Sequence, residues 1–289
     1  MRCKLKLQTA LLCLGAWCLL NPISLHAQTN FEKNLQTKIE SMCAAAGTAW
    51  PELPAASQQV YPNDALQSVM SPTGWGGSGT YVFGSIGGIY PEVYKQNKGD
   101  LITSAGVCTG SSEKAVNVAV SINMTDVHRL RDFSENFFIS RMLGHGSSIT
   151  VAALQMFANA QQSDAPGSTF YIAFSHAVQT LLSKTSGCSK LSYSIGIGTG
   201  RFLYKSPKDI EAGHGKYGTA VFGNISYEIL QHVNLNAEWS GMNLGFSLGW
   251  RPFVKSPLSI GAGVTNLTRF SADKPSAILS IGYPLSIKR

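Results

Sequence analysis

Residues 217–250 read YGTAVFGNISYEILQHVNLNAEWSGMNLGFSLGW, and apolar side chains alternate with small or polar ones along most of this stretch. The alternation falls into three consecutive segments, at 217–229, 233–241 and 243–252. Because every second side chain lies on the same face of a strand, each segment has one apolar face and one small or polar face. The stretch therefore predicts consecutive strands of one sheet.

The content of charged residues indicates which face of these strands meets water. A soluble barrel would expose the Gly, Ser and Asn face, and soluble surfaces carry roughly 25–35% Asp, Glu, Lys and Arg. Only 13% of this chain is charged. Tyr217 and Tyr227 lie ten residues apart on the apolar face, which at a strand tilt of about 40° spans about 25 Å, the height of the apolar band of membrane barrels. We therefore expect the apolar face to meet lipid and the polar face to line a lumen. A soluble barrel or sandwich is the alternative.

Similar segments continue on both sides of this stretch. Twelve candidate strands cover residues 79–90, 99–110, 114–126, 135–143, 147–158, 168–180, 190–201, 217–229, 233–241, 243–252, 258–268 and 276–287. An even number of strands is usual in bacterial barrels made of one chain. We predict an all-β fold, an antiparallel up-and-down transmembrane β-barrel of about twelve strands over residues 79–289, preceded by a short amphipathic helix.

The last segment carries a resemblance to a known class of proteins. Its apolar face comprises Ala277, Leu279, Ile281, Tyr283 and Leu285. This pattern resembles the terminal strand that the barrel-insertion machinery reads in bacterial outer-membrane β-barrels. Over residues 79–287 the chain resembles that class by pattern, and no sharp motif assigns a subfamily. The resemblance implies a location in the bacterial outer membrane, with outer-membrane lipid and the insertion machinery as partners, and it leaves the oligomeric state open.

The chain begins with the features of an export signal. Basic residues among the first six precede an apolar run over residues 7–20, which is short for a membrane span, and Ala27 offers a small residue for cleavage. We expect residues 1–27 to be removed near Ala27; an uncleaved membrane anchor is the alternative. Three of the 23 Lys and Arg residues are then lost against 16 Asp and Glu, so the net charge falls from +7 to +4. This mild charge gives no reason to expect a nucleic-acid partner.

Residues 28–78 are expected to form a periplasmic N-terminal part. Phe31, Leu35, Ile39 and Met42 follow helical spacing and predict a short amphipathic helix. The Pro- and Gly-containing remainder has no clear periodicity. It is either a flexible lead into the barrel or a plug folded into the lumen, and the sequence permits both.

One short motif suggests catalysis. His145-Gly146-Ser147 resembles the His-x-Ser motif of outer-membrane phospholipases and lipid A deacylases, which are also barrels. Residues i and i+2 share a strand face, so His145 could act as a general base for Ser147. The surrounding sequence is equally compatible with a Gly-containing hairpin turn. No third residue that would orient the histidine is identifiable.

Charged and amide side chains on the polar parity of neighbouring strands are the expected lumen-lining residues. They are Glu228, Glu238, Arg251, Asn234 and Asn236. Charges in such a place need water or a paired partner. They either form a structural ion-pair network that closes the lumen or line a path for a solute.

Three cysteines remain after removal of the signal, in an oxidising compartment that permits disulfides. We favour a Cys43–Cys188 pair, with Cys108–Cys188 as the second choice and three free thiols as the other possibility. His176, His214 and His232 lack the spacing of metal ligands. We therefore expect neither a metal nor a cofactor.

Together these features predict an outer-membrane barrel with porin-like passage of a small solute or a structural role, and they lean away from an enzyme. Two other functions stay open: a lipid hydrolase that uses His145 and Ser147, and a surface adhesion or interaction protein that uses its outer loops.

Overall fold

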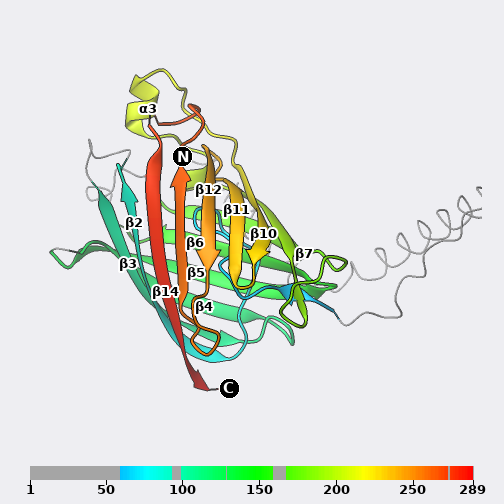
Figure 1. Ribbon diagram of the computed structural model, residues 1–289. Helices are drawn as coiled ribbons and strands as arrows, with labels where there is room; N and C mark the ends of the chain where they lie inside the picture. Colours follow the sequence, from blue (N-terminus) through cyan, green and yellow to red (C-terminus); the bar gives the residue numbers. More distant parts are fainter. Residues whose placement is uncertain (1–58, 93–98, 128, 159–166, 273, 289) are drawn as a thin grey trace, which may run out of the picture.

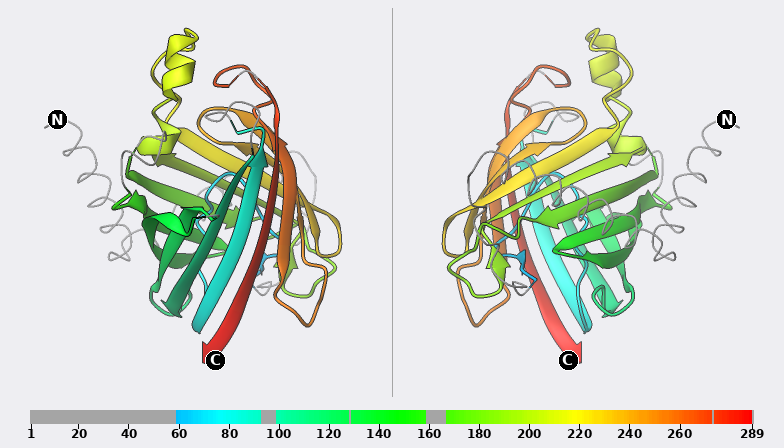
Figure 2. Two further views of the ribbon diagram at one scale, coloured as in Figure 1. Left: turned by 90° about the vertical axis from the view of Figure 1, so that its left-hand side faces the viewer. Right: turned by 90° about the vertical axis from the view of Figure 1, so that its right-hand side faces the viewer.

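The computed structural model describes residues 59–92, 99–127, 129–158, 167–272 and 274–288. Twelve antiparallel strands close into a barrel (Figures 1 and 2), in the order β10-β11-β12-β13-β14-β2-β3-β4-β5-β6-β7-β9, with β9 pairing back to β10. The strands are β2 (Thr80–Tyr90), β3 (Asp100–Gly110), β4 (Asn117–Asp126), β5 (Arg131–Gly144), β6 (Ser147–Met156), β7 (Thr169–Ala177), β9 (Leu191–Gly198), β10 (Val221–Leu230), β11 (Val233–Trp239), β12 (Leu244–Trp250), β13 (Ser259–Thr265) and β14 (Ser276–Lys288). The prediction of a twelve-stranded antiparallel barrel is confirmed.

The two faces of the wall differ as the alternation requires. On the outer face, Ile225 is 57% exposed and Leu248 is 46% exposed. On the inner face, Asn234, Asn236 and Ser247 are each at most 2% exposed. Since period two assigns each parity to one face, the wall is apolar outside and small or polar inside.

The strand predicted to begin at Tyr217 begins later, at Val221. Residues before it bond to other loops: the Gly218 amide donates to the Leu203 carbonyl, and the Thr219 amide donates to the Gly241 carbonyl. Ala220 has a φ of 60°, which breaks the extended conformation. The alternation of residue types thus continues four residues beyond the strand. Because Tyr217 belongs to the loop, the distance between Tyr217 and Tyr227 does not give the height of the apolar band.

At one end of the barrel most connections are short, except those at 178–190 and 251–258, and the other end carries most of the larger loops (Figure 2). We call them the turn end, where β14 finishes, and the loop end. The loop end holds the 3-10 helix η1 (Gly200–Phe202) and the helix α3 (Pro207–Glu211). None of the described helices is long and apolar enough to span a membrane. The predicted signal at 1–27 and the predicted helix around Phe31–Met42 lie outside the described residues.

Residues 59–78 run inside the barrel, and we call them the inner segment. They enter at the turn end, where β1 (Tyr61–Pro62) pairs in parallel with β8 (Cys188–Ser189), in the connection between β7 and β9. They climb to the level of Glu238 and return to the turn end, where the Gly79 amide donates to the Gly110 carbonyl at the end of β3. The segment therefore forms a loop within the lumen, blue to cyan in Figure 1.

The outward position of Leu248 leads to a prediction. Replacing Leu248 by Arg should reduce the free energy of folding in lipid by up to about 2–4 kcal/mol, because a charge near the bilayer midplane loses its hydration. Urea titration of the protein folded into vesicles measures this. Leu230→Arg is the matched control: Leu230 is 67% exposed at the last position of β10, at the interface, where the cost falls to about 0–1 kcal/mol. Equal losses in both variants would contradict the assigned membrane depth.

Candidate functional site

Glu238 binds the backbone of the inner segment at residues 69–71, where the segment bends back toward the turn end. Its carboxylate is 1% exposed and accepts hydrogen bonds from the backbone amides of Val69 (3.0 Å), Met70 (2.8 Å) and Ser71 (2.9 Å). The hydroxyl of Ser68 also donates to it, as does that of Ser247 on β12, at 2.6 Å. Several donors converging on one ionised carboxylate compensate for its burial. The charge thereby fixes this bend of the chain against β11.

A second anchor lies at the turn end. Asp64 of the inner segment accepts from His232 Nδ1 at 2.7 Å and from Arg251 Nη1 at 2.8 Å. Both partners follow the ends of wall strands, β10 and β12. Of the residues expected to line the lumen, Arg251 thus pairs with the inner segment, and Glu238 binds the segment's backbone.

The remaining three expected lumen residues also lie on the inner face. Asn234 exchanges hydrogen bonds with Asn63, at 2.8 and 2.9 Å, and Asn236 donates to the Leu66 carbonyl at 3.3 Å. Glu228 is 3% exposed, and its Oε1 has no hydrogen-bond partner among the described residues. The amide ladder on β11 is therefore occupied by the inner segment, whereas Glu228 lies apart from it.

Glycines on the inner face let the inner segment approach the wall. A Cβ atom on Gly249 would overlap the Leu66 carbonyl oxygen and lie 2.7 Å from its carbon. A Cβ on Gly261 would lie 2.6 Å from Val69 Cγ2, and one on Gly245 would lie 2.7 Å from Met70 Sδ. All of these are below the normal contact distance of carbon atoms. Gly245, Gly249 and Gly261 thus form a slot that only residues without a side chain allow.

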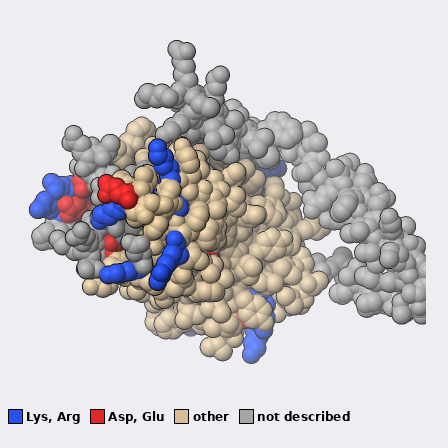
Figure 3. Space-filling model, turned by 90° about the horizontal axis from the view of Figure 1, so that it is seen from above, with Lys and Arg blue, Asp and Glu red and all other residues tan. Residues whose placement is uncertain are grey.

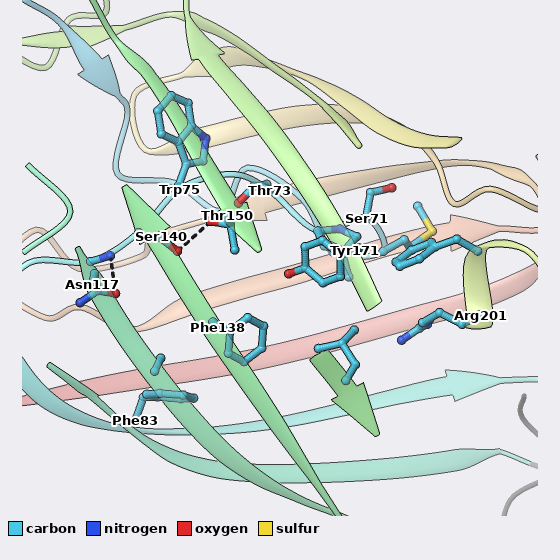
Figure 4. A pocket seen from close by; sticks show the side chains of 18 of the residues that line it. Ser71, Thr73, Trp75, Phe83, Asn117, Phe138, Ser140, Thr150, Tyr171 and Arg201 are labelled. Atoms are coloured by element: carbon cyan, nitrogen blue, oxygen red, sulfur yellow. Dashed lines mark hydrogen bonds between the residues drawn. The ribbon is translucent and has the colours of Figure 1, made fainter. Parts of the chain in front are cut away.

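The other half of the lumen holds a cavity of about 480 Å³ (Figure 4). The inner segment, including Met70 and Trp75, forms one side of it. The opposite side is the wall from β2 to β7, with Phe83, Ala119 and Phe138 among its lining residues. The cavity is mostly apolar and is within the usual size range of sites for small organic ligands.

The two ends of the cavity differ in their polar groups. At the turn end, Asn117 Oδ1 accepts from the Gly77 amide at 3.2 Å, and the hydroxyls of Ser140 and Thr150 bond each other at 2.7 Å. These groups are therefore satisfied by the protein itself. At the loop end, Tyr171 and Arg201 line the cavity beside Phe202. Within the described part of the chain, no carboxylate pairs with the Arg201 guanidinium.

An aromatic cluster supports that loop end. Phe202 and Phe222 stack with ring centroids 4.2 Å apart, and Tyr171 meets both edge-on, at 5.9 and 5.6 Å. All three rings are at most 4% exposed. A packed cluster of this kind holds its rings in one arrangement. It therefore positions η1, and with it Arg201.

The outer loops are joined by a buried carboxylate. Asp209 in α3 accepts from Ser271 Oγ and from the Ala272 amide, both at 2.6 Å, and from Ser206 Oγ at 2.8 Å. Burial alone would raise the pKa of Asp209, but hydrogen bonds from Ser271, Ala272, Ser206 and His214 outweigh it and lower the pKa below 3.8. Asp209 thus fastens the loop after β9 to the loop after β13.

Acid should break the hydrogen bonds by which Asp209 joins these two loops. A carboxyl whose pKa is lower in the folded state adds stability above its unfolded pKa, and this stability is lost as the pH falls through the folded value. We therefore expect the Ala272 amide to be protected from hydrogen exchange at neutral pH and to lose that protection in the acid range below about 3.8. In Asp209→Asn the protection should be low at pH 7 and change little with pH. Protection that persists in this variant would contradict the role of the carboxylate.

Basic side chains gather at the loop end of the barrel. Figure 3 looks onto the loop end and shows Lys and Arg side chains gathered on it. The exposed ones are Arg129, Arg131, Arg201, Lys208, Lys216, Arg269 and Lys274. Two of the acidic residues of this end are engaged, since Asp209 is buried and Asp126 pairs with Arg131 at 3.0 Å. Glu92, Asp100, Asp132 and Glu211 lie at the same end, so the basic side chains there are interspersed with acidic ones.

The structure gives Ser147 a different partner from the one in the sequence motif. Ser147 Oγ lies 2.9 Å from Nδ1 of His176 on the neighbouring strand β7. His145 is instead the exposed residue of the β5–β6 turn, with a φ of 47°. Because the inner face carries Ser148 and Ser175, Ser147 and His176 lie on the outer face, near the turn end. Tyr193 stands next to them, with its ring 5.5 Å from that of His176.

Cys43 lies outside the described residues, so the Cys43–Cys188 pair stays a prediction. Cys108 and Cys188 are not bonded to each other, so the second-choice pair is not formed. Burial, followed by the carboxylates of Asp64 and Glu228, raises the pKa of Cys188. This thiol is therefore mostly protonated at neutral pH and reacts slowly. Among the described residues, no three His, Cys, Asp or Glu side chains gather as a metal site.

No protein-family model matches the chain, and no curated protein matches it. Similar solved structures include outer membrane phospholipase A from Escherichia coli, with 9% identity over 73% of this chain and 94% of that one and a TM-score of 0.39. The Salmonella typhi outer membrane phospholipase dimer with bound calcium has 9% identity over 72% and 91%, with a TM-score of 0.38. A triple mutant of Rhodopseudomonas blastica porin has 7% identity over 71% and 99%, with a TM-score of 0.32. These values are too low to carry an argument about activity. The solved structures similar to this chain are thus bacterial outer-membrane barrels, and no subfamily is assigned.

Proposed function

We propose that this protein is an outer-membrane barrel that passes a small solute through its lumen, with the inner segment as the gate. The observation that carries the proposal is the division of the lumen. The inner segment occupies the half against β11–β13, and a cavity of about 480 Å³ remains beside β2–β7. A purely structural barrel would need neither a shaped cavity nor a separately anchored segment. The outward apolar face supports the membrane location.

The contacts of the inner segment suit a gate. Its polar contacts with the wall are hydrogen bonds and one ion-pair cluster, at Asp64, Asn63 and Glu238, and they can be exchanged for water without opening the wall. Its remaining contacts are packing against the inward glycines of β12 and β13. The segment also closes the turn end of the cavity through Gly76 and Gly77, whose carbonyls accept from Ser112 Oγ at 3.3 and 3.1 Å. Movement of this segment would therefore open the cavity toward the turn end.

Liposome swelling tests the proposal. Vesicles that contain the wild-type protein or Gly249→Ala are diluted into an isotonic pentose, and the rate of swelling reports passage. We expect slow swelling with the wild type and faster swelling with the variant, because the added methyl group displaces the gate. Swelling at the rate of protein-free vesicles for both proteins, when both are folded, would overturn the proposal.

A second candidate function rests on Ser147 and His176. A neutral imidazole 2.9 Å from a serine hydroxyl can take its proton. Because the pair lies on the outer face near the turn end, an ester bond of a lipid could reach it. Lipid hydrolysis is therefore worth testing with these two residues rather than with His145.

If this candidate holds, the wild-type protein hydrolyses phospholipid in mixed micelles and Ser147→Ala lowers the rate by about a hundredfold or more. His176→Gln should lower it similarly, and His145→Gln should leave it unchanged. The release of fatty acid measures the rate. Equal rates for the wild type and Ser147→Ala would remove the hydrolase from consideration.

A further inference from the structure

We propose that the lumen cavity is a binding site for a small amphipathic carboxylate, whose apolar body lies in the cavity and whose carboxylate binds Arg201. The proposal names the solute class of the proposed passage and rests on it for the role of the site in transport. The binding itself follows from the residues of the cavity alone.

The apolar body of the ligand is indicated by the middle of the cavity. Phe83, Ala119, Phe138 and Leu154 line it from the wall, and Trp75 and Met70 line it from the inner segment. Water in such surroundings forms few hydrogen bonds, so an apolar group gains free energy by replacing it. Aromatic rings on several sides favour a flat or slender body.

The polar groups at the two ends of the cavity differ, and this difference indicates where the charged group of the ligand binds. At the turn end, Asn117, Ser140 and Thr150 bond within the protein, and the Trp75 indole N–H, which has no partner among the described residues, is a neutral donor. The loop end offers Arg201, which has no carboxylate partner among the described residues, and the Tyr171 hydroxyl, for which the described residues provide no hydrogen-bond acceptor. Figure 4 shows Arg201 across the cavity from Asn117 and Ser140, with the Tyr171 ring between them and its hydroxyl pointing into the cavity. Arg201 and Tyr171 are both donors, so the matching group is an acceptor with negative charge.

The direction of entry agrees with this assignment. Arg201 belongs to η1 at the loop end and is exposed, so an anion meets it on arrival from that side. Arg201 differs from the other exposed Lys and Arg side chains of the loop end because it also lines the cavity. A carboxylate held there would place its apolar body toward Phe138.

Equilibrium binding to the full mature protein in lipid nanodiscs tests the site. The probes are 2-naphthoate and its neutral counterpart 2-naphthamide, and binding is followed by calorimetry. We expect the wild type to bind naphthoate more tightly than naphthamide. Arg201→Gln should weaken naphthoate about tenfold or more, the effect of losing one hydrogen bond to a charged group, and leave naphthamide unchanged. Arg269→Gln is the control, since it removes an exposed arginine of the same end outside the cavity lining.

A cavity-filling variant tests the position of the apolar body. Ala119→Phe should abolish the binding of both probes while circular dichroism and thermal unfolding stay those of a folded barrel. Unchanged naphthoate affinity in Arg201→Gln, or in a folded Ala119→Phe, would overturn the proposal. So would an equal loss of both probes in Arg201→Gln. If naphthoate binds but the vesicles do not swell, the binding site is supported and the proposed passage of solute is contradicted. If the vesicles swell in pentose but naphthoate does not bind, the passage is supported and the binding site is contradicted.

Discussion

Replacing Glu238 by Gln should free the top of the inner segment. The carboxylate accepts from the amides of Val69, Met70 and Ser71 and from two hydroxyls. A glutamine keeps one acceptor oxygen and turns an NH2 group toward the Val69 amide or the Ser247 hydroxyl, so the charge and at least one hydrogen bond to it are lost. At about 1.5–3 kcal/mol for one hydrogen bond to a charged group, the state in which the inner segment is bound to the wall is destabilised by that amount. The population of the released segment should therefore rise about tenfold or more.

Hydrogen exchange of the amides of residues 69–71 measures this release, and single-channel recording in a planar bilayer measures its effect on conductance. The exchange rate of these amides and the conductance should both rise in Glu238→Gln. Glu211→Gln is the control, because Glu211 is an exposed glutamate at the end of α3. Amide exchange in Glu238→Gln that matches the wild type would show that the carboxylate does not hold the segment.

Replacing Gly249 by Ala should displace the inner segment from a different side. The methyl group would overlap the backbone carbonyl of Leu66, which cannot rotate away as a side chain could. Overpacking in a filled interior costs about 1–3 kcal/mol or more. Since the wall is held by strand pairing on both sides of β12, the segment is the part that moves. We expect faster proteolysis near Leu66 and more frequent channel opening.

Gly87→Ala is the matched control for this variant. Gly87 is also a wall glycine, and a Cβ atom there would lie 3.6 Å from its nearest neighbours, an ordinary contact. This variant should keep the wild-type proteolysis pattern and conductance. If Gly249→Ala behaves in the same way, the slot formed by Gly245, Gly249 and Gly261 does not seat the segment.

The wall could be predicted from sequence because its signal is local. Alternation along each strand places Leu248 outside and Ser247 inside, and it needs no knowledge of other strands. The same locality explains the misplaced start of β10. The alternation through Tyr217–Ala220 is a property of composition, whereas the left-handed φ of Ala220 depends on the loops packed around it.

The site could be predicted only in part because its contacts are not local. Parity singled out Glu238, Asn234 and Arg251, but their partners lie far away in the chain: Asn63 and Asn234 are 171 positions apart. The pairing of Ser147 with His176 depends likewise on the register of β6 and β7, which residue types do not specify. One usable signal was present, since Gly245, Gly249 and Gly261 share the inward parity and mark a place where backbone approaches closely.

The path of the inner segment has a topological consequence. Its two ends leave the barrel at the same rim, beside Gly187 and beside Gly110, so the chain enters the lumen as a loop and does not thread through it. A threaded chain could be removed only by pulling a free end through the whole pore or by parting two strands. A loop can be withdrawn while every strand pair stays intact. Opening is therefore a local unfolding event with its own free energy, and it can be tuned by substitutions that leave the stability of the barrel itself unchanged.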